Sequence, residues 1–214
     1  STVYYKSNIQ ETDMTAYNII KSLSKRGNSV LGSGCYAAAL SSTVDGNKVI
    51  KVGNNTNDPW LDYYEVIKAN QNNPCVPRIY SFYIDTAHNY YVCVMERLTE
   101  QTFSPAVTEA MDFCKEFVEG WFTDEEFLAD SAKHDKHIPY PEHMLALLKH
   151  IKEQTDYVKG EEVPYEVDGG RMLDMHHGNF LMRDDTIIVT DPWCEANMED
   201  IDDVNYWASR HNVG

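Results

Sequence analysis

The segment LDMHHGNF, residues 173–180, places an aspartate, two adjacent histidines and an asparagine among apolar residues. The two histidines beside a carboxylate resemble metal ligands, but no third ligand of suitable spacing accompanies them, which disfavours zinc. The other interpretation takes Asp174 and Asn179, five residues apart, as the chemical pair. In phosphoryl transfer an aspartate accepts the proton of the attacking hydroxyl group, and an asparagine downstream holds a magnesium ion. The spacing favours this second interpretation.

A second aspartate, Asp191, follows the apolar run TIIVT (186–190). In phosphoryl transfer an aspartate beyond a short hairpin chelates magnesium against the phosphates. Magnesium prefers oxygen ligands and takes few of them from the protein, so one amide and one carboxylate suffice. We therefore predict that Asn179 and Asp191 are the metal ligands and that Asp174 positions the hydroxyl group and accepts its proton.

Two features upstream match the same chemistry. In LGSGCYAAAL (31–40), Gly32 and Gly34 stand at a predicted turn, where backbone amides can close over phosphates. Lys51 lies inside the predicted strand NKVIKVG (47–53). A strand lysine after a glycine-rich hairpin holds the α- and β-phosphates of ATP in kinases. Each feature alone has a plain alternative, a simple hairpin or a solvent-facing lysine, but the order of all four motifs is one that chance seldom produces.

This order of motifs resembles the protein-kinase-like superfamily over residues 29–193. The segments LGSGCYAAAL, NKVIKVG, LDMHHGNFLM and VTDP are most similar to the early serine/threonine protein kinases of podovirus-type coliphages. The resemblance implies an α+β, bilobal, protein-kinase-like fold, with a small β-rich N-lobe (1–98) and a reduced, mostly helical C-lobe (99–214). It also implies ATP and Mg²⁺ as cofactors, and transfer of the γ-phosphoryl group to serine or threonine of host proteins in the bacterial cytoplasm.

The resemblance further implies which residues contact the nucleotide. Met95 corresponds to the gatekeeper, and backbone groups of Glu96 and Leu98 would meet the adenine edge. Glu65 is the candidate ion-pair partner of Lys51, the alternative being a surface glutamate. The complete set of implied nucleotide-binding residues is Gly32, Gly34, Tyr36, Lys51, Glu65, Glu96 and Leu98.

The histidines are interpreted differently from each other. DMHHGN also resembles the DLHPGN loop of small-molecule phosphotransferases, which have a histidine at the position of His176. His176 would help to neutralise the transferred phosphoryl group or orient Asp174, the alternative being loop packing. His177 is interpreted as structural or exposed.

The chain departs from ordinary eukaryotic-type kinases in two ways. Met172 and Leu173 replace the arginine that usually precedes the catalytic aspartate, so control through a phosphorylated activation loop is not expected. Few residues follow Asp191, so a protein substrate would be held without the usual helical platform. The acidic run MEDIDD (198–203) would attract basic partners or simply be solvated.

Composition narrows the function classes. Asp and Glu number 34 against 18 Lys and Arg, a formal charge of −16, which argues against direct binding of nucleic acid through its phosphates. Basic protein partners, mimicry of nucleic acid or solubility alone would explain the acidic excess. The five cysteines form no CxxC pair, and no apolar run approaches the length of a membrane span, so we expect a soluble, cytoplasmic protein without a membrane partner.

Two alternatives to a protein kinase stay open. One is a small-molecule phosphotransferase of the aminoglycoside or choline type. The other is a non-catalytic, kinase-derived acidic protein that binds and inhibits a host factor.

The elements that must position these residues follow from periodicity and turn chemistry. Asp45-Gly46 favours a tight hairpin turn, and Asp58-Pro59 favours a helix start. The lobe boundary is predicted near residues 96–103. We predict helices over residues 13–27, 60–70, 105–121 and 141–157, and strands over 29–34, 36–44, 47–53, 78–84, 89–98, 180–182 and 187–189.

Overall fold

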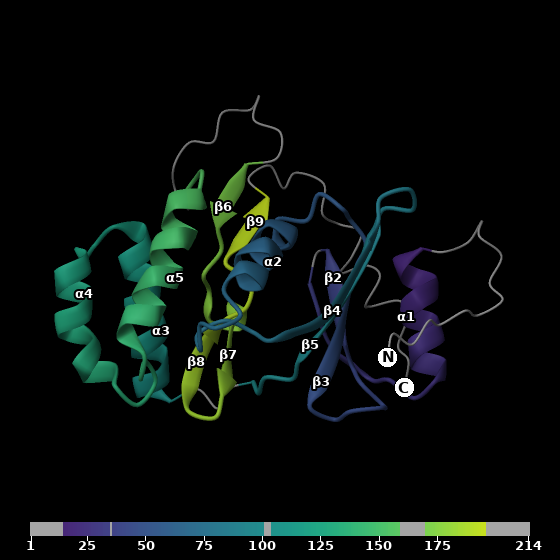
Figure 1. Cartoon of the computed structure of the whole chain (residues 1–214), viewed down its shortest axis with the longest axis horizontal. Helices are drawn as coiled ribbons and strands as arrows, with labels where there is room; N and C mark the ends of the chain where they lie inside the picture. The colour runs from purple at the N-terminus through teal and green to yellow at the C-terminus, as the bar shows by residue number, and fades with distance from the viewer. Residues whose placement is uncertain (1–14, 35, 101–103, 159–169, 196–214) are drawn as a thin grey trace. The chain divides into compact units, whose positions relative to one another are not determined.

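A computed structural model of the chain describes residues 15–34, 36–100, 104–158 and 170–195 (Figure 1). The chain divides into two compact units. Of the described residues, the first unit contains those up to Thr56 together with Tyr80–Met95, and the second contains Asn57–Ile79 and those from Glu96 to Glu195. Within the described ranges, no helix is both long enough and apolar enough to cross a membrane.

The first unit is built on a five-stranded sheet with the order β1-β2-β3-β5-β4. Its strands are β1 (Val30–Ser33), β2 (Ala37–Ser41), β3 (Lys48–Gly53), β4 (Ile79–Asp85) and β5 (Tyr90–Glu96). The turn between β2 and β3 contains Asp45-Gly46, as predicted, and the Asp45 carboxylate accepts a hydrogen bond from the Asn47 amide at 3.0 Å. This bond closes the turn locally.

Helix α1 (Ala16–Lys25) packs on one face of this sheet (Figure 1). The helix contributes the apolar side chains Ile19, Ile20 and Leu23, which contact a cluster that includes Leu40 and Val52. Alternate side chains of a strand point to opposite faces of the sheet. The face of the sheet that α1 leaves uncovered is therefore the one that carries Lys51.

The second unit is mostly helical. Its helices are α2 (Trp60–Ala69), α3 (Pro105–Glu119), α4 (Asp124–Asp130) and α5 (Pro141–Gln154), with 3₁₀ turns at Ser131–His134 and His177–Asn179. Two antiparallel pairs complete it: β6 (Arg171–Leu173) with β9 (Trp193–Glu195), and β7 (Phe180–Arg183) with β8 (Thr186–Val189).

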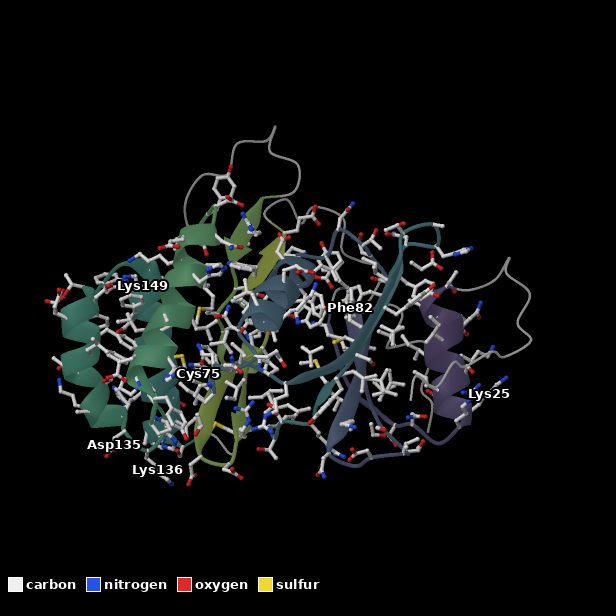
Figure 2. The ribbon with its side chains drawn as sticks, in the orientation of Figure 1. Lys25, Cys75, Phe82, Asp135, Lys136 and Lys149 are labelled. Carbon is white, nitrogen blue, oxygen red and sulfur yellow. The ribbon has the colours of Figure 1, made fainter. Side chains whose placement is uncertain are left out.

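Aromatic and aliphatic side chains fill the core of the second unit. The rings of Phe113 and Phe127 stack with centroids 4.7 Å apart, and Met144 and Leu148 are fully buried on α5. Cys75 is buried in the same unit (Figure 2). The sequence predicted α3 and α5 but not α4, which begins with a capping box in which Thr123 and Glu126 bond each other's backbone.

The division into units differs from the predicted one. The predicted N-lobe, residues 1–98, included the segment with α2, whereas residues 57–79 belong to the second unit. The cause is that α2 buries Trp60 and Tyr63, whose polar atoms bond to backbone carbonyl groups of the second unit. The predicted helix start is confirmed, because the Asp58 carboxylate accepts a hydrogen bond from the Trp60 amide at 2.9 Å. The acidic run 198–203 lies outside the described residues.

Gly53 offers a test of packing in the first unit. A Cβ atom at this position would lie 2.0 Å from the ring of Tyr91, which is fully buried and stacks on Phe82. We predict that Gly53→Ala costs about 1–3 kcal/mol of stability through overpacking. Gly46→Ala is the matched control, since nothing in the described structure lies within 4 Å of its added Cβ.

Thermal unfolding followed by circular dichroism measures the effect as a lower midpoint for Gly53→Ala alone. An unchanged midpoint would show that the Tyr91 ring moves aside at no cost.

Candidate active site

Backbone hydrogen bonds bring Asp174, Asn179 and Asp191 together in the second unit. The Asp174 amide donates to the Pro192 carbonyl at 2.8 Å, which extends the ladder between β6 and β9. The Thr190 amide donates to the Asn179 carbonyl at 2.9 Å. Asp191 is the residue between these two anchors, so its position is set by both Asp174 and Asn179.

The side chain of Asn179 has a defined orientation. Its Nδ2 donates to the Asp174 carbonyl at 2.7 Å and to Asp174 Oδ2 at 3.2 Å. Only the nitrogen of an amide can donate, so Oδ1 is the atom left to bind another group. The hydrogen bond to Oδ2 also holds the Asp174 carboxylate in place.

The two histidines have different partners. His176 Nδ1 accepts a hydrogen bond from the Gly178 amide at 3.0 Å, so the proton of the neutral ring is on Nε2, which lies 3.8 Å from Asp174 Oδ2. His177 Nε2 contacts Asp112 of α3 at 2.9 Å, a structural contact that ties the loop to the helical core. Among the described residues, no three His, Cys, Asp or Glu side chains form a cluster able to hold a metal.

Helix α2 supplies two contacts that sequence reasoning missed. The Tyr63 hydroxyl donates to the Val189 carbonyl at 2.8 Å, and Trp60 Nε1 donates to the Thr190 carbonyl at 3.2 Å. Burial raises the pKa of Tyr63 well above its usual value, and the charge of Asp191 adds to the rise, so the hydroxyl stays protonated and able to donate. The only indication in the sequence was that Trp60 and Tyr63, two aromatic residues able to donate hydrogen bonds, stand three positions apart in a predicted helix.

In the first unit, Lys51 lies opposite Ala39 in the β2–β3 ladder. Burial raises the pKa of Cys93 on β5 to about 12, and the charge of Lys51 opposes that rise, which places the lysine near Cys93. Met95, the predicted gatekeeper, follows two residues later on β5, so its side chain points to the same face. Lys51 and Met95 therefore share the face that α1 leaves open.

The glycine-rich turn joins β1 to β2. Gly34 donates its amide to the Ala37 carbonyl at 2.8 Å, and the Asn54 amide donates to the Tyr36 carbonyl at 2.8 Å. Nothing in the described chain lies within 4 Å of a Cβ added at Gly32 or Gly34. The space beside both glycines is therefore open, as an approach of phosphates to the backbone requires.

The remaining predicted nucleotide contacts fall in the second unit. Glu65 is exposed on α2 and pairs with Lys68 at 3.2 Å; its pairing with Lys51 stays a prediction. The Glu96 amide donates to the Arg78 carbonyl at 2.9 Å, and the contact of its backbone with an adenine stays a prediction. Leu98 is half-buried and is also still a prediction as an adenine contact.

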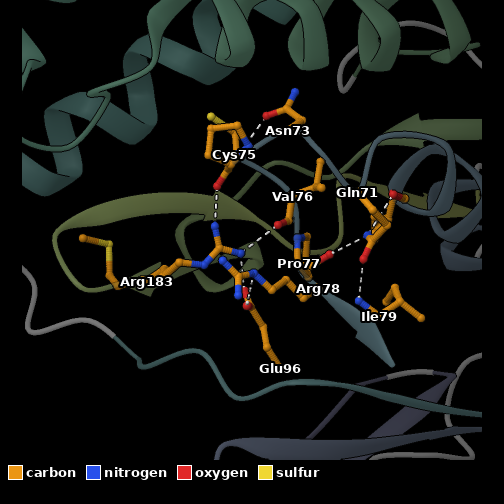
Figure 3. A network of polar contacts seen from close by, with 12 residues as sticks. Gln71, Asn73, Cys75, Val76, Pro77, Arg78, Ile79, Glu96 and Arg183 are labelled. Carbon is orange, nitrogen blue, oxygen red and sulfur yellow. Dashed lines mark hydrogen bonds and ion pairs between the residues drawn. The ribbon is translucent and has the colours of Figure 1, made fainter. Parts of the chain in front are cut away.

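An arginine network fixes the segment that contains Glu96 (Figure 3). The Arg183 guanidinium donates to the carbonyl groups of Pro74 and Val76 and to the Glu96 carboxylate. Arg78 approaches the same carboxylate at 3.8 Å but is largely exposed. Arg183 thus joins β7 to the end of β5 and to the segment between α2 and β4. No pattern in the sequence had indicated this network.

The fold is of the protein-kinase-like class. The features that define it are the five-stranded sheet with Lys51, the helical unit, and the proximity of Asp174, Asn179 and Asp191 within that unit. The sequence model of the family described as bacteriophage T7 protein kinase 0.7 matches residues 4–205, so the chain belongs to this family.

Solved structures similar to the chain include aminoglycoside phosphotransferases. APH(2″)-IIa in a ternary complex with streptomycin and ATP is 13% identical, with 88% of this chain and 74% of that chain covered and a TM-score of 0.34. ADP-bound APH(2″)-Ib is 13% identical, with 83% and 72% covered and a TM-score of 0.35. The gentamicin complex of APH(2″)-IIa is 14% identical, with 86% and 70% covered and a TM-score of 0.36. No curated protein matches the sequence.

The arginine network leads to a stability prediction. Arg183→Ala leaves the nearly buried Glu96 carboxylate without its main partner, and removing one member of such a pair costs about 3 kcal/mol or more. Arg78→Ala is the matched control: it removes an exposed guanidinium from the same carboxylate and should cost no more than about 1 kcal/mol.

Urea unfolding followed by tryptophan fluorescence suits this test, because Trp60 and Trp193 are both buried in the second unit. Equal losses in the two variants would contradict the assignment of Arg183 as the principal partner.

Proposed function

We propose that the protein transfers the γ-phosphoryl group of ATP to serine or threonine hydroxyl groups of host proteins, with Mg²⁺ as the metal. The observation that carries the proposal is the hydrogen-bonded arrangement of Asp174, Asn179 and Asp191. Membership of the bacteriophage T7 protein kinase 0.7 family supports the same reaction class.

The donor set suits magnesium. Asn179 turns its amide nitrogen to Asp174, which leaves Oδ1 as an oxygen ligand, and Asp191 supplies a carboxylate. Magnesium prefers such oxygen donors and keeps several waters. When bound, the ion would neutralise charge on the phosphates.

Asp174 has the role of orienting the acceptor hydroxyl group and taking its proton. Its backbone is fixed at both ends, because its amide donates to Pro192 and its carbonyl accepts from His176 and Asn179. Its side chain is partly exposed, so an acceptor hydroxyl can reach it. Fixed geometry of this kind lowers the barrier by removing the need to orient the reacting groups. Lys51 and the glycine-rich turn of the first unit would hold the phosphates.

Two observations bear on the class of substrate. The formal charge of −16 supports basic protein substrates, because an acidic surface attracts them electrostatically. His176, with Nε2 facing Asp174, supports a second candidate, a small-molecule phosphotransferase, since its loop resembles that of such enzymes.

We predict that Asp174→Asn lowers phosphoryl transfer by about 10²–10⁴-fold, because an amide cannot accept the proton. The measurement is transfer of γ-labelled phosphate from Mg-ATP into proteins of a bacterial lysate. Asp184→Asn is the matched control: Asp184 is exposed in the β7–β8 turn at φ +54°, a conformation that asparagine tolerates well.

Labelled protein bands that vanish only with Asp174→Asn support the protein kinase. Label confined to small molecules favours the second candidate. If wild-type protein transfers no label while it still captures a host protein, the enzymatic proposal is overturned in favour of a non-catalytic binding protein.

A further inference from the structure

We propose that Tyr63 and Trp60 of α2 are positioning residues of the magnesium site. Their side chains hold the Val189–Thr190 backbone and thereby set the position of Asp191. This inference rests on the proposed function and deepens it, because it names the residues outside the site that determine how tightly the site binds its metal.

The hydrogen bonds form one connected path. Trp60 Nε1 donates to the Thr190 carbonyl, and Tyr63 donates to the carbonyl one residue earlier. Thr190 in turn donates both its amide and its hydroxyl to the Asn179 carbonyl, each at 2.9 Å. Asn179 then donates to Asp174. A displacement of α2 is therefore transmitted to both predicted metal ligands and to the catalytic aspartate.

Packing makes this path rigid. Tyr63 is 0% exposed and Trp60 1% exposed. The Tyr63 ring meets Trp193 edge-on, with centroids 5.9 Å apart and an interplanar angle of 89°. Trp193 is the second residue after Asp191, so Tyr63 contacts the chain on both sides of that ligand. Figure 1 shows α2 beside the β6–β9 pair, and α2 and β9 are in contact.

The two donors affect the site as well as the stability of the fold, because they bond the backbone directly before Asp191. A buried carbonyl without a donor is costly, so loss of either donor drives the local backbone toward another arrangement. The nearest functional group on that backbone is the Asp191 carboxylate. A shift of about 1 Å in a positioned group is enough to lower activity about 10²-fold.

Tyr63→Phe is the sharpest test, because it removes one oxygen atom and keeps the ring and its contact with Trp193. The first measurement is binding of Mn²⁺, a spectroscopic substitute for Mg²⁺, with a non-hydrolysable ATP analogue, followed by electron paramagnetic resonance of the free ion. The second is the Mg²⁺ concentration that gives half-maximal phosphoryl transfer. Tyr140→Phe is the matched control, because Tyr140 lies in the same unit but is exposed.

We expect Tyr63→Phe to weaken Mn²⁺ binding about tenfold and to raise the half-maximal Mg²⁺ concentration by a similar factor. The KM for ATP at saturating Mg²⁺ should stay unchanged, as should all values for Tyr140→Phe. If Tyr63→Phe does not fold, which thermal unfolding reveals, Trp60→Phe replaces it with the same expectation.

Equal Mn²⁺ binding by folded Tyr63→Phe and wild-type protein overturns the inference, even if activity falls, because a purely structural role would lower activity without changing metal affinity. Absence of Mn²⁺–nucleotide binding by the wild-type protein overturns the proposed function, and this inference fails with it. Weaker binding in the variant alone supports both.

Discussion

The second unit depends on pairing the buried backbone around Asp191. Val189 is fully buried, and the carbonyl groups of Val189, Thr190 and Pro192 each accept a hydrogen bond from a residue outside this segment. Leaving such a carbonyl unpaired costs about 1–3 kcal/mol. The donors come from α2 and from Asp174. The hydrogen bonds that pair these buried carbonyl groups therefore also bring the residues of the candidate site together. The same hydrogen bonds thus stabilise the second unit and position the residues of the candidate site.

Features that arise from neighbouring residues could be predicted from the sequence. The Asp45-Gly46 turn and the helix start at Asp58 depend on side chains that bond to backbone within a few residues. The pairing of Asp174 with Asn179 is also local, because the 3₁₀ turn at His177–Asn179 brings the amide back to the aspartate. The five-residue spacing of Asp174 and Asn179, which predicted phosphoryl-transfer chemistry, is thus the spacing that lets this turn bring the two side chains together.

Features that join distant parts of the chain could not be predicted. Periodicity identified α2 as a helix, but the apolar face of a helix does not reveal which core will bury it. Arg183 and Glu96 are 87 residues apart, and neither carries a sequence signal of its partner. Glu65 was proposed as the partner of Lys51 from the resemblance to kinases; the structure shows its contact with Lys68, and the pairing with Lys51 stays a prediction.

The placement of α2 bears on regulation. In protein kinases the position of the corresponding helix controls activity through a lysine–glutamate pair. Here the helix is fixed to the segment preceding Asp191 by its own buried aromatic residues, and it belongs to the unit that carries Asp174, the proposed catalytic residue. Control through movement of α2 is therefore not expected, just as control through a phosphorylated activation loop is not expected without an arginine directly before Asp174.

The contact between Trp60 and Thr190 also has a consequence during translation. These residues are 130 positions apart. At about 5–20 residues per second, a ribosome needs roughly 7–26 s to synthesise the intervening chain. For that time the apolar side of α2 has emerged without the backbone segment that later covers it. Newly made chains therefore pass through a stage in which this surface is open to chaperones or to aggregation, and the stage ends only when the β7–β8 hairpin leaves the ribosome.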